Sequence, residues 1–317
     1  MDQNGFVRVW HNETSPATIF GVDQATTLPG TRFSRLAASA PPEGFFVGSA
    51  VFHYLGPAFA VLLFALVEPL GVAWLRIVSA AAVFALWRRP WRVFGALDRS
   101  DLRTVVAMGG VLAVMNACFY LSIDRLPLGT VAAIEFLPVI ALAAVGMRTA
   151  RNAVALAAAV AGVYLLTDVR IEGEPVGVGF VFANAALFTL YIVVAHRVAR
   201  ADRMSGIDGL GAAMLVATLA ITPIGVWSAA PALLDPIALL AGFGVGISSS
   251  VIPYVCDQLA MARLSRATYS LMVSLLPATA TAVGIVVLAQ IPSSTEILGV
   301  GLVVAAVAIH RESNPAG

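Results

Sequence analysis

The chain has 317 residues, of which 59% are hydrophobic and only 12% are charged, and its mean hydropathy is +0.89. Soluble proteins carry about 25% charged residues, so most of this chain must face lipid rather than water. This composition excludes a secreted disulfide scaffold, a nucleic-acid-binding protein and a disordered regulator, and the formal net charge of +1 indicates no acidic partner.

Residues 1–44 differ from the rest of the chain, because they are polar and rich in Thr, Ser and Pro. They lack the basic start and the apolar core of a signal peptide. We therefore expect a disordered cytoplasmic tail. A docking role for this tail stays open, since its composition names no partner.

Apolar stretches follow almost back to back from residue 45 onward, and most are long enough to cross a bilayer as a helix. The fifth stretch is short, and the eighth is interrupted by Gly and Ser. We predict an all-α polytopic membrane protein with ten transmembrane helices, at residues 45–66, 69–87, 102–123, 127–146, 152–167, 176–196, 207–229, 237–260, 268–288 and 295–309.

The basic residues, all of them arginine, predict the orientation of these helices. With a cytoplasmic N-terminus, 16 of the 19 arginines fall on the cytoplasmic side, and only Arg125 and Arg170 fall on the other. The remaining one, Arg76, lies inside the membrane. Because basic residues beside helix ends stay cytoplasmic, both termini are predicted to be cytoplasmic.

The two halves of the chain share an arrangement of helix, tight turn and proline-containing helix. Residues 120–127 precede a helix that contains Pro138, and residues 259–265 precede a helix that contains Pro277. Five helices per half, at 45–167 and 176–310, would make the second half an inverted copy of the first, as in secondary transporters. Both prolines would then point toward a central cavity, although simple kinks in packing helices are an alternative.

Several short motifs stand out: Phe119-Tyr120-Leu121-Ser122-Ile123, Leu126-Pro127-Leu128-Gly129, Glu135-Phe136, Pro253-Tyr254, Ala260 and Arg263-Leu264. In these residues the chain resembles the EamA-type branch of the drug/metabolite transporter superfamily, and within it the bacterial threonine/homoserine exporters. The resemblance covers about residues 48–313. It implies two inverted five-helix EamA repeats in the inner membrane that export small metabolites against proton entry. The chain departs from the family pattern at Leu275-Leu276-Pro277, where Glu is common before the proline, and at Ala289-Gln290, where Gly-Glu is expected.

Four polar residues inside the predicted membrane share one layer. Counted at 1.5 Å per residue, Arg76, Asn116, Glu135 and Asn184 all lie roughly 10 to 12 Å below the outer ends of their helices. Buried charges are costly in lipid, so we expect the four to face one substrate cavity. Glu135 would accept a proton and bind an ammonium group, and Arg76 would bind a carboxylate or release Glu135 as its protonation changes. The alternatives are a tethering Arg76–Glu135 ion pair and interhelical packing of the two amides.

Further candidates are His53 and Asp257 for proton coupling or gating, and Tyr120 and Tyr254 for substrate binding. Each has a plain structural alternative: a hydrogen-bonded histidine, an interfacial Asp257–Arg263 pair, or tyrosines in the core or the aromatic belt. The run from Gly242 to Ser250 would allow either close helix packing or local unwinding.

These observations favour an exporter of small amino acids that works by proton antiport. Its partners would be a small zwitterionic metabolite, protons and the lipid bilayer. We expect no cofactor, metal or nucleic acid, because the chain has no Cys/His cluster and no phosphate-binding motif. A membrane enzyme is disfavoured because no serine has a histidine at a suitable depth. The alternative is a transporter of the same fold for another amino acid, a purine or a toxic amphiphile. The oligomeric state stays open.

Overall fold

The computed structural model describes residues 42–95, 97–135, 137–138, 149–171, 174–199, 206–253, 256 and 275–309. Within these ranges the backbone forms helices and short connections, with no strand. The helices are α4 (Pro42–Leu63), α5 (Pro69–Arg88), α6 (Trp91–Phe94), α7 (Arg99–Ile123), α8 (Leu128–Glu135), α10 (Ala150–Ile171), α11 (Pro175–Ala199), α12 (Gly206–Leu234), α13 (Pro236–Gly246), the π-helix η1 (Ile247–Val251), α16 (Leu276–Leu288) and α17 (Ser294–Ile309).

Five helices are long and apolar enough to cross a membrane, at Gly44–Leu63, Pro69–Arg88, Arg99–Ile123, Pro175–Ala195 and Asp208–Leu234. Shorter apolar helices at Ala150–Leu166, Pro236–Val251, Leu276–Leu288 and Ser294–Ile309 accompany them. The predicted all-helical class is therefore confirmed. Of the predicted tail, residues 1–41 lie outside the described residues, and residues 42–44 already belong to α4.

The helix boundaries follow from local signals in the sequence. The first helix ends at Leu63 rather than at the predicted residue 66, because Pro69 holds Glu68 in an extended conformation, with ψ 152°, and a turn is needed before it. The prediction that the seventh helix ends at residue 229 is wrong by five residues. Helix α12 continues through Pro231 to Leu234. Asp235 then caps α13 by accepting hydrogen bonds from two backbone amides.

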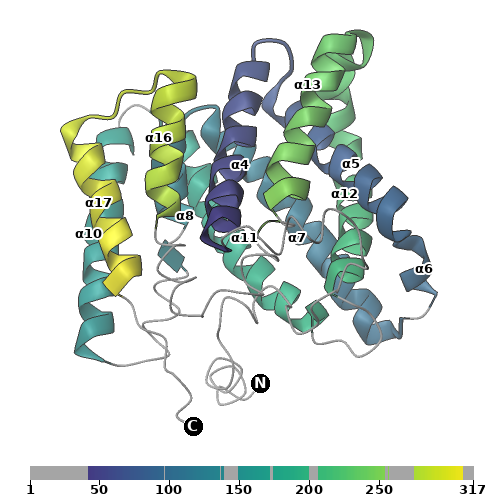
Figure 1. The fold of residues 1–317 in the computed structure, drawn as a ribbon, viewed down its shortest axis with the longest axis horizontal. Helices are drawn as coiled ribbons and strands as arrows, with labels where there is room; N and C mark the ends of the chain where they lie inside the picture. Colours follow the sequence, from purple (N-terminus) through teal and green to yellow (C-terminus); the bar gives the residue numbers. More distant parts are fainter. Residues whose placement is uncertain are drawn as a thin grey trace.

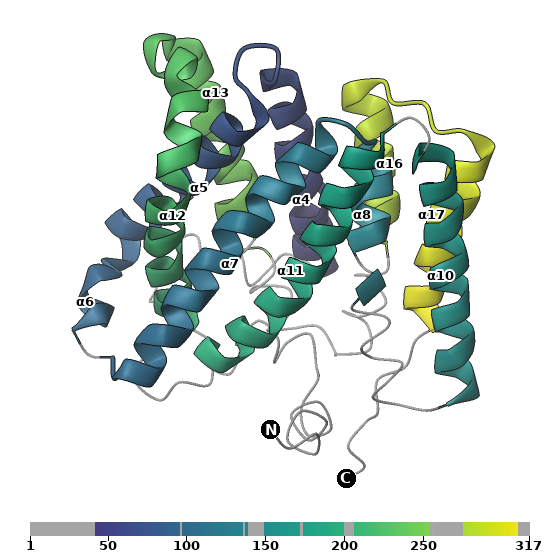
Figure 2. The ribbon, with the colours of Figure 1, turned by 180° about the vertical axis from the view of Figure 1, so that it is seen from behind.

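The helices form one bundle, shown from its two sides in Figures 1 and 2. Helices α10 and α17 pack together along one edge, and α5, α6, α12 and α13 form the opposite edge. Helices α4, α7, α8, α11 and α16 lie between these edges. The bundle interior therefore receives side chains from both halves of the sequence.

Helices α5 and α12 pack closely along their length. A Cβ atom on Gly71 would lie 2.5 Å from the carbonyl oxygen of Ser228, and one on Gly225 would lie 2.5 Å from the Cβ of Trp74. The indole Nε1 of Trp74 donates a hydrogen bond of 2.9 Å to Oγ1 of Thr222. Small residues thus bring the two backbones together, as expected in lipid, where packing rather than hydrophobicity joins helices.

Polar contacts also join the two ends of the α5–α12 pair. At one end, the hydroxyl of Ser228 donates a hydrogen bond of 2.7 Å to Oε2 of Glu68. At the other end, Arg88 donates from Nε and Nη2 to the two carboxylate oxygens of Asp208, at 2.9 and 3.2 Å. The pair is therefore fixed at both ends as well as in its middle.

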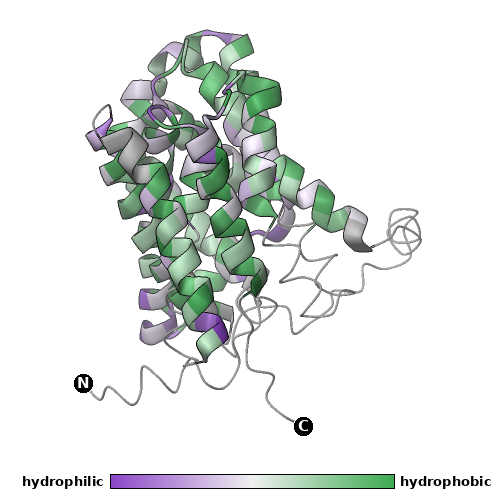
Figure 3. Ribbon diagram, turned by 90° about the vertical axis from the view of Figure 1, so that its left-hand side faces the viewer, coloured by the Kyte–Doolittle hydropathy of each residue, from purple (hydrophilic) through white to green (hydrophobic). Residues whose placement is uncertain are grey.

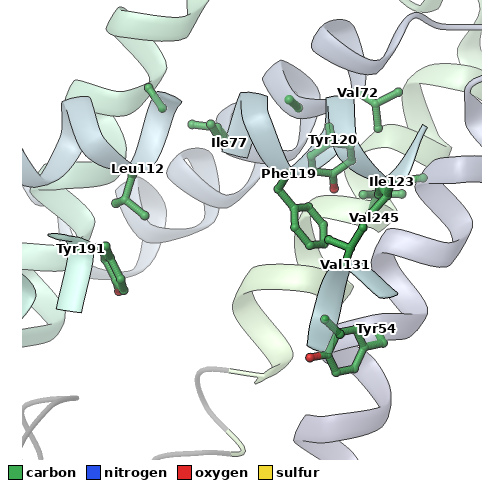
Figure 4. Close-up of a cluster of buried hydrophobic side chains, with 14 of the residues drawn as sticks. Tyr54, Val72, Ile77, Leu112, Phe119, Tyr120, Ile123, Val131, Tyr191 and Val245 are labelled. Atoms are coloured by element: carbon green, nitrogen blue, oxygen red, sulfur yellow. The ribbon is translucent and has the colours of Figure 1, made fainter. Parts of the chain in front are cut away.

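Hydrophobic residues run along the helices, and hydrophilic residues gather toward the ends of the bundle (Figure 3). Large apolar side chains such as Leu219, Leu240 and Val286 are mostly exposed. A bundle that leaves such side chains outside is suited to lipid surroundings. Its core is also apolar, and Tyr54 and Tyr120 belong to the same buried cluster as Phe119, Val131 and Val245 (Figure 4).

Candidate functional site

Arg76 lies on α5, where that helix meets the π-helix η1. Its Nε donates a hydrogen bond of 3.2 Å to Oγ of Ser250, and its Nη2 donates one of 3.3 Å to the carbonyl oxygen of Ser249. The guanidinium carbon lies 5.7 Å from the centre of the Tyr120 ring on α7, a cation–π contact. Neutral groups from two neighbouring helices therefore hold this partly buried charge.

The close approach of α5 to α13 and η1 depends on a small residue. A Cβ atom on Gly246 would lie 1.7 Å from Oγ of Ser79 and 2.8 Å from the carbonyl oxygen of Arg76. On the other side of η1, a Cβ on Gly56 of α4 would lie 2.0 Å from Oγ of Ser249. The run of small residues thus packs closely against both neighbouring helices, and Ile247–Val251 within it form a π-helical turn.

Glu135 is the last residue of α8 and lies against α11. Nδ2 of Asn184, which is fully buried, donates a hydrogen bond of 3.1 Å to Oε1 of Glu135. The structure thus joins two of the four residues predicted to share one membrane layer.

Arg76 and Glu135 interact electrostatically but form no ion pair within 4.0 Å, although the structure describes both side chains. The alternative in which the two residues simply tether α5 to α8 is therefore ruled out for this conformation. A positive and a negative group lie in the same part of the bundle, and each is held by neutral partners.

Three buried side-chain atoms lack a hydrogen-bond partner among the described residues: the Tyr120 hydroxyl, Oδ1 of Asn184 and Oγ of Ser249. The Tyr120 hydroxyl lies beside Arg76 and Ser249 without meeting hydrogen-bond geometry with either. All three atoms belong to residues that contact Arg76 or Glu135. Buried polar atoms are nearly always paired, so three exceptions at one place need an explanation.

His53 of α4 lies on the inner side of the bundle. Val51 and Leu62 are exposed and mark the outer side of this helix. At about 100° per residue, His53 lies about 200° from Val51 and about 180° from Leu62. It is nevertheless exposed, so its accessible surface is turned toward the bundle interior. Its ring packs edge-on against that of Tyr54, with the ring centres 5.2 Å apart.

The other predicted residues are placed less centrally. The amide of Asn116 is buried and donates a hydrogen bond of 2.8 Å to the carbonyl oxygen of Leu112 in its own helix. Pro138 lies just beyond α8, and Pro277 is buried in the first turn of α16. Tyr254 and Asp257 lie outside the described residues.

Sequence reasoning missed Ser249 and Ser250 as residues of the site. Their run was recognised only for its small size. The signal that pointed to them was its three consecutive hydroxyls inside an apolar span, because a buried arginine needs hydrogen-bond acceptors.

The second part of the chain, residues 175–310, matches the model of the EamA-like transporter family. The chain is also 30% identical over 256 residues to the threonine/homoserine exporter RhtA of Escherichia coli strain K12, and the match covers 79% of this chain and 84% of that protein. The chain belongs to the EamA-like transporter family. The protein of the same name from Salmonella typhimurium strain SL1344 is 29% identical over 255 residues, with the same coverage.

This EamA-like chain is therefore a multi-pass membrane transporter and not an enzyme, as the sequence indicated.

One position at which the chain departs from the family pattern still forms a hydrogen bond to a neighbouring helix. The side chain of Gln290, which replaces the expected Glu, accepts a hydrogen bond of 3.1 Å from the backbone amide of Leu128. A cavity of about 160 Å³ beside it is lined by residues that include Thr130, Thr281 and Glu296, and lies apart from Arg76 and Glu135.

Proposed function

We propose that this EamA-like transporter exports small amino acids of the threonine/homoserine type across the inner membrane, in exchange for protons. The observation that carries the proposal is the unpaired Arg76 and Glu135, each held by neutral groups within the bundle. The related exporters named for threonine and homoserine support this substrate class.

The proposed architecture is ten spans in two inverted repeats, at 45–167 and 176–310, behind the tail at 1–44. The helix contacts support it. The helices of the first half, α4, α5, α7, α8 and α10, correspond in this order to α11, α12, α13, α16 and α17 of the second half. With this matching, the contact between α4 and α16 corresponds to the contact between α11 and α8. The same matching relates α5–α13 to α12–α7 and α4–α13 to α11–α7. The pairs α5–α12, α8–α16 and α10–α17 map onto themselves, as expected across a two-fold axis in the membrane plane.

Both termini are proposed to be cytoplasmic. Support comes from the side of the bundle where α5 ends and α7 begins, which carries Arg88, Arg89, Arg92, Arg99 and Arg103. Arg125 lies at the opposite end of α7. This asymmetry agrees with basic residues remaining on the cytoplasmic side.

In the proposed mechanism, Glu135 alternates between a proton and the ammonium group of the substrate. Arg76 binds the substrate carboxylate, and Asn184, Tyr120, Asn116 and Tyr254 complete the binding site. His53, on the inner face of α4, passes protons between the cytoplasm and Glu135, and Asp257 contributes to gating at the cytoplasmic side. The partners are thus a zwitterionic metabolite and protons, and no cofactor is required.

Inside-out membrane vesicles test this proposal, because export then appears as uptake. An imposed pH gradient, acid inside, should drive accumulation of radiolabelled L-threonine or L-homoserine. Glu135→Gln should lose gradient-driven uptake and weaken exchange of labelled for unlabelled substrate, since it removes both the proton site and the charge that binds the ammonium group. Arg76→Gln should lose both activities.

Glu68→Gln is the matched control. The Glu68 carboxylate accepts a hydrogen bond from Ser228 at the start of α5, away from Arg76, so this substitution should not affect transport. Vesicles that accumulate neither amino acid would exclude this substrate class, and a panel including purines and cationic amphiphiles would test the alternative cargo. If Glu135→Gln and Arg76→Gln both accumulate threonine like the wild type, the proposed site is wrong.

A further inference from the structure

The unpartnered atoms in the bundle divide into two chemical kinds. The Tyr120 hydroxyl lies next to Arg76, and the Ser249 hydroxyl lies close to that of Tyr120 and against Gly56 of α4; both can donate hydrogen bonds. The free atom next to Glu135 is Oδ1 of Asn184, which can only accept. Donors therefore accompany the positive charge, and an acceptor accompanies the negative charge.

We infer that Tyr120 and Ser249 form the carboxylate-binding part of the site together with Arg76, while Asn184 and Glu135 bind the primary ammonium group. This inference rests on the proposed function and deepens it. It assigns a direction to the substrate, with its carboxylate toward η1 and its ammonium group toward α11. It also requires a free carboxylate, so amines that lack one are poor substrates.

The contacts of Arg76 agree with this role. Its guanidinium group is positioned by Ser250, by the Ser249 carbonyl oxygen and by the Tyr120 ring. Two of these three groups belong to residues whose hydroxyls remain free. The same residues thus hold the arginine and offer hydrogen-bond donors beside it, which is the arrangement that a carboxylate needs.

A purely structural role for these hydroxyls is disfavoured energetically. A buried polar atom without a partner destabilises a protein, and Ser249 and Tyr120 each carry one. The π-helix η1, which presents Ser249, also lengthens the hydrogen-bonding pattern of its turn, and π-helical turns are frequent at functional sites. A ligand that binds both hydroxyls explains why they are kept.

The test compares L-threonine with L-threoninol, in which an alcohol replaces the carboxylate. Binding to purified, full-length protein is measured by ligand-induced thermal stabilisation and by competition for threonine transport. We expect Tyr120→Phe and Ser249→Ala to weaken threonine binding about tenfold or more each, since hydrogen bonds to charged groups are lost. Threoninol binding should be weak in the wild type and unchanged in both variants.

Stability without ligand separates this role from a structural one. Both variants should unfold at the wild-type temperature or higher, because each removes an unpartnered polar atom. Ser248→Ala is the matched control: the Ser248 hydroxyl already donates to the Val245 carbonyl oxygen, so threonine binding should not change.

Three results would overturn the inference: unchanged threonine binding in both variants, an equal loss of threoninol binding, or a lower unfolding temperature without ligand. If the wild type binds neither compound and no other amino acid, the proposed function itself fails. If the wild type binds a solute without a carboxylate equally well, export can stand but this assignment is wrong.

Discussion

Replacing Gly246 by alanine should displace α13 from α5 next to Arg76, the arginine of the candidate site. The new Cβ would lie 2.8 Å from the carbonyl oxygen of Arg76 and 1.7 Å from Oγ of Ser79. Ser79 is itself held by a hydrogen bond of 3.0 Å to that carbonyl, so its hydroxyl cannot turn away without losing it. Normal contact begins near 3.4 Å, so the backbones must separate by about 0.6 Å to clear the carbonyl oxygen alone, and by more if the Ser79 hydroxyl keeps its place.

The expected loss of stability follows from two opposing terms. Overpacking costs about 1 to 3 kcal/mol, and alanine gains about 0.5 to 1 kcal/mol over glycine within a helix. Gly246→Ala should therefore lower the free energy of unfolding by up to about 2.5 kcal/mol and impair threonine transport. Gly244→Ala provides the control, because nothing lies within 4 Å of its Cβ, and it should be as stable as the wild type or more stable.

Thermal unfolding in detergent, followed by the amount of protein that remains monodisperse, measures the contrast. A second variant combining Gly246→Ala with Ser79→Gly should recover part of the loss, since it removes the contacts with the serine but not that with the carbonyl. Equal unfolding temperatures for Gly246→Ala and Gly244→Ala would refute the packing described for α5 and α13.

Three further substitutions test contacts outside the site. Ala289 adopts a left-handed conformation with φ 52°, so Ala289→Gly should raise the free energy of unfolding by up to about 1 kcal/mol; a lower unfolding temperature would contradict this. Gln290→Leu leaves the backbone amide of Leu128 without its acceptor and should cost about 1 kcal/mol, measured as a lower unfolding temperature. Asp208→Asn should cost less than about 1 kcal/mol, because its ion pair with Arg88 is partly exposed, and the difference from the wild type should shrink in high salt.

Helix ends marked by strong local signals could be predicted from the sequence. The second span was expected at 69–87 and runs from Pro69 to Arg88, because proline favours the first turn and the basic pair Arg88-Arg89 precedes Pro90. The seventh span was placed less well. It was expected to end at residue 229, but α12 continues through Pro231 to Leu234. Neighbouring helices can satisfy the carbonyl that a proline frees within a membrane, and a single sequence does not show those neighbours.

The depth of polar residues could also be estimated, whereas their partners could not. Counting residues placed Glu135 and Asn184 in one layer, and the structure joins them by a hydrogen bond. Depth alone left an Arg76–Glu135 ion pair as an open alternative. The partners of Arg76 come from η1, where a π-helical turn changes which serines face α5, and hydropathy carries no signal for such a turn.

The attachment of α5 to α12 limits how this transporter can change shape. These helices belong to different halves of the chain, yet they are joined at Glu68–Ser228, at Trp74–Thr222 and at Arg88–Asp208. A motion that swung one half away from the other would break all three connections at once. To open to either side of the membrane while keeping these three connections, the protein must move a unit that contains helices from both halves. Within this unit, α5 and α12 move together as one rigid body.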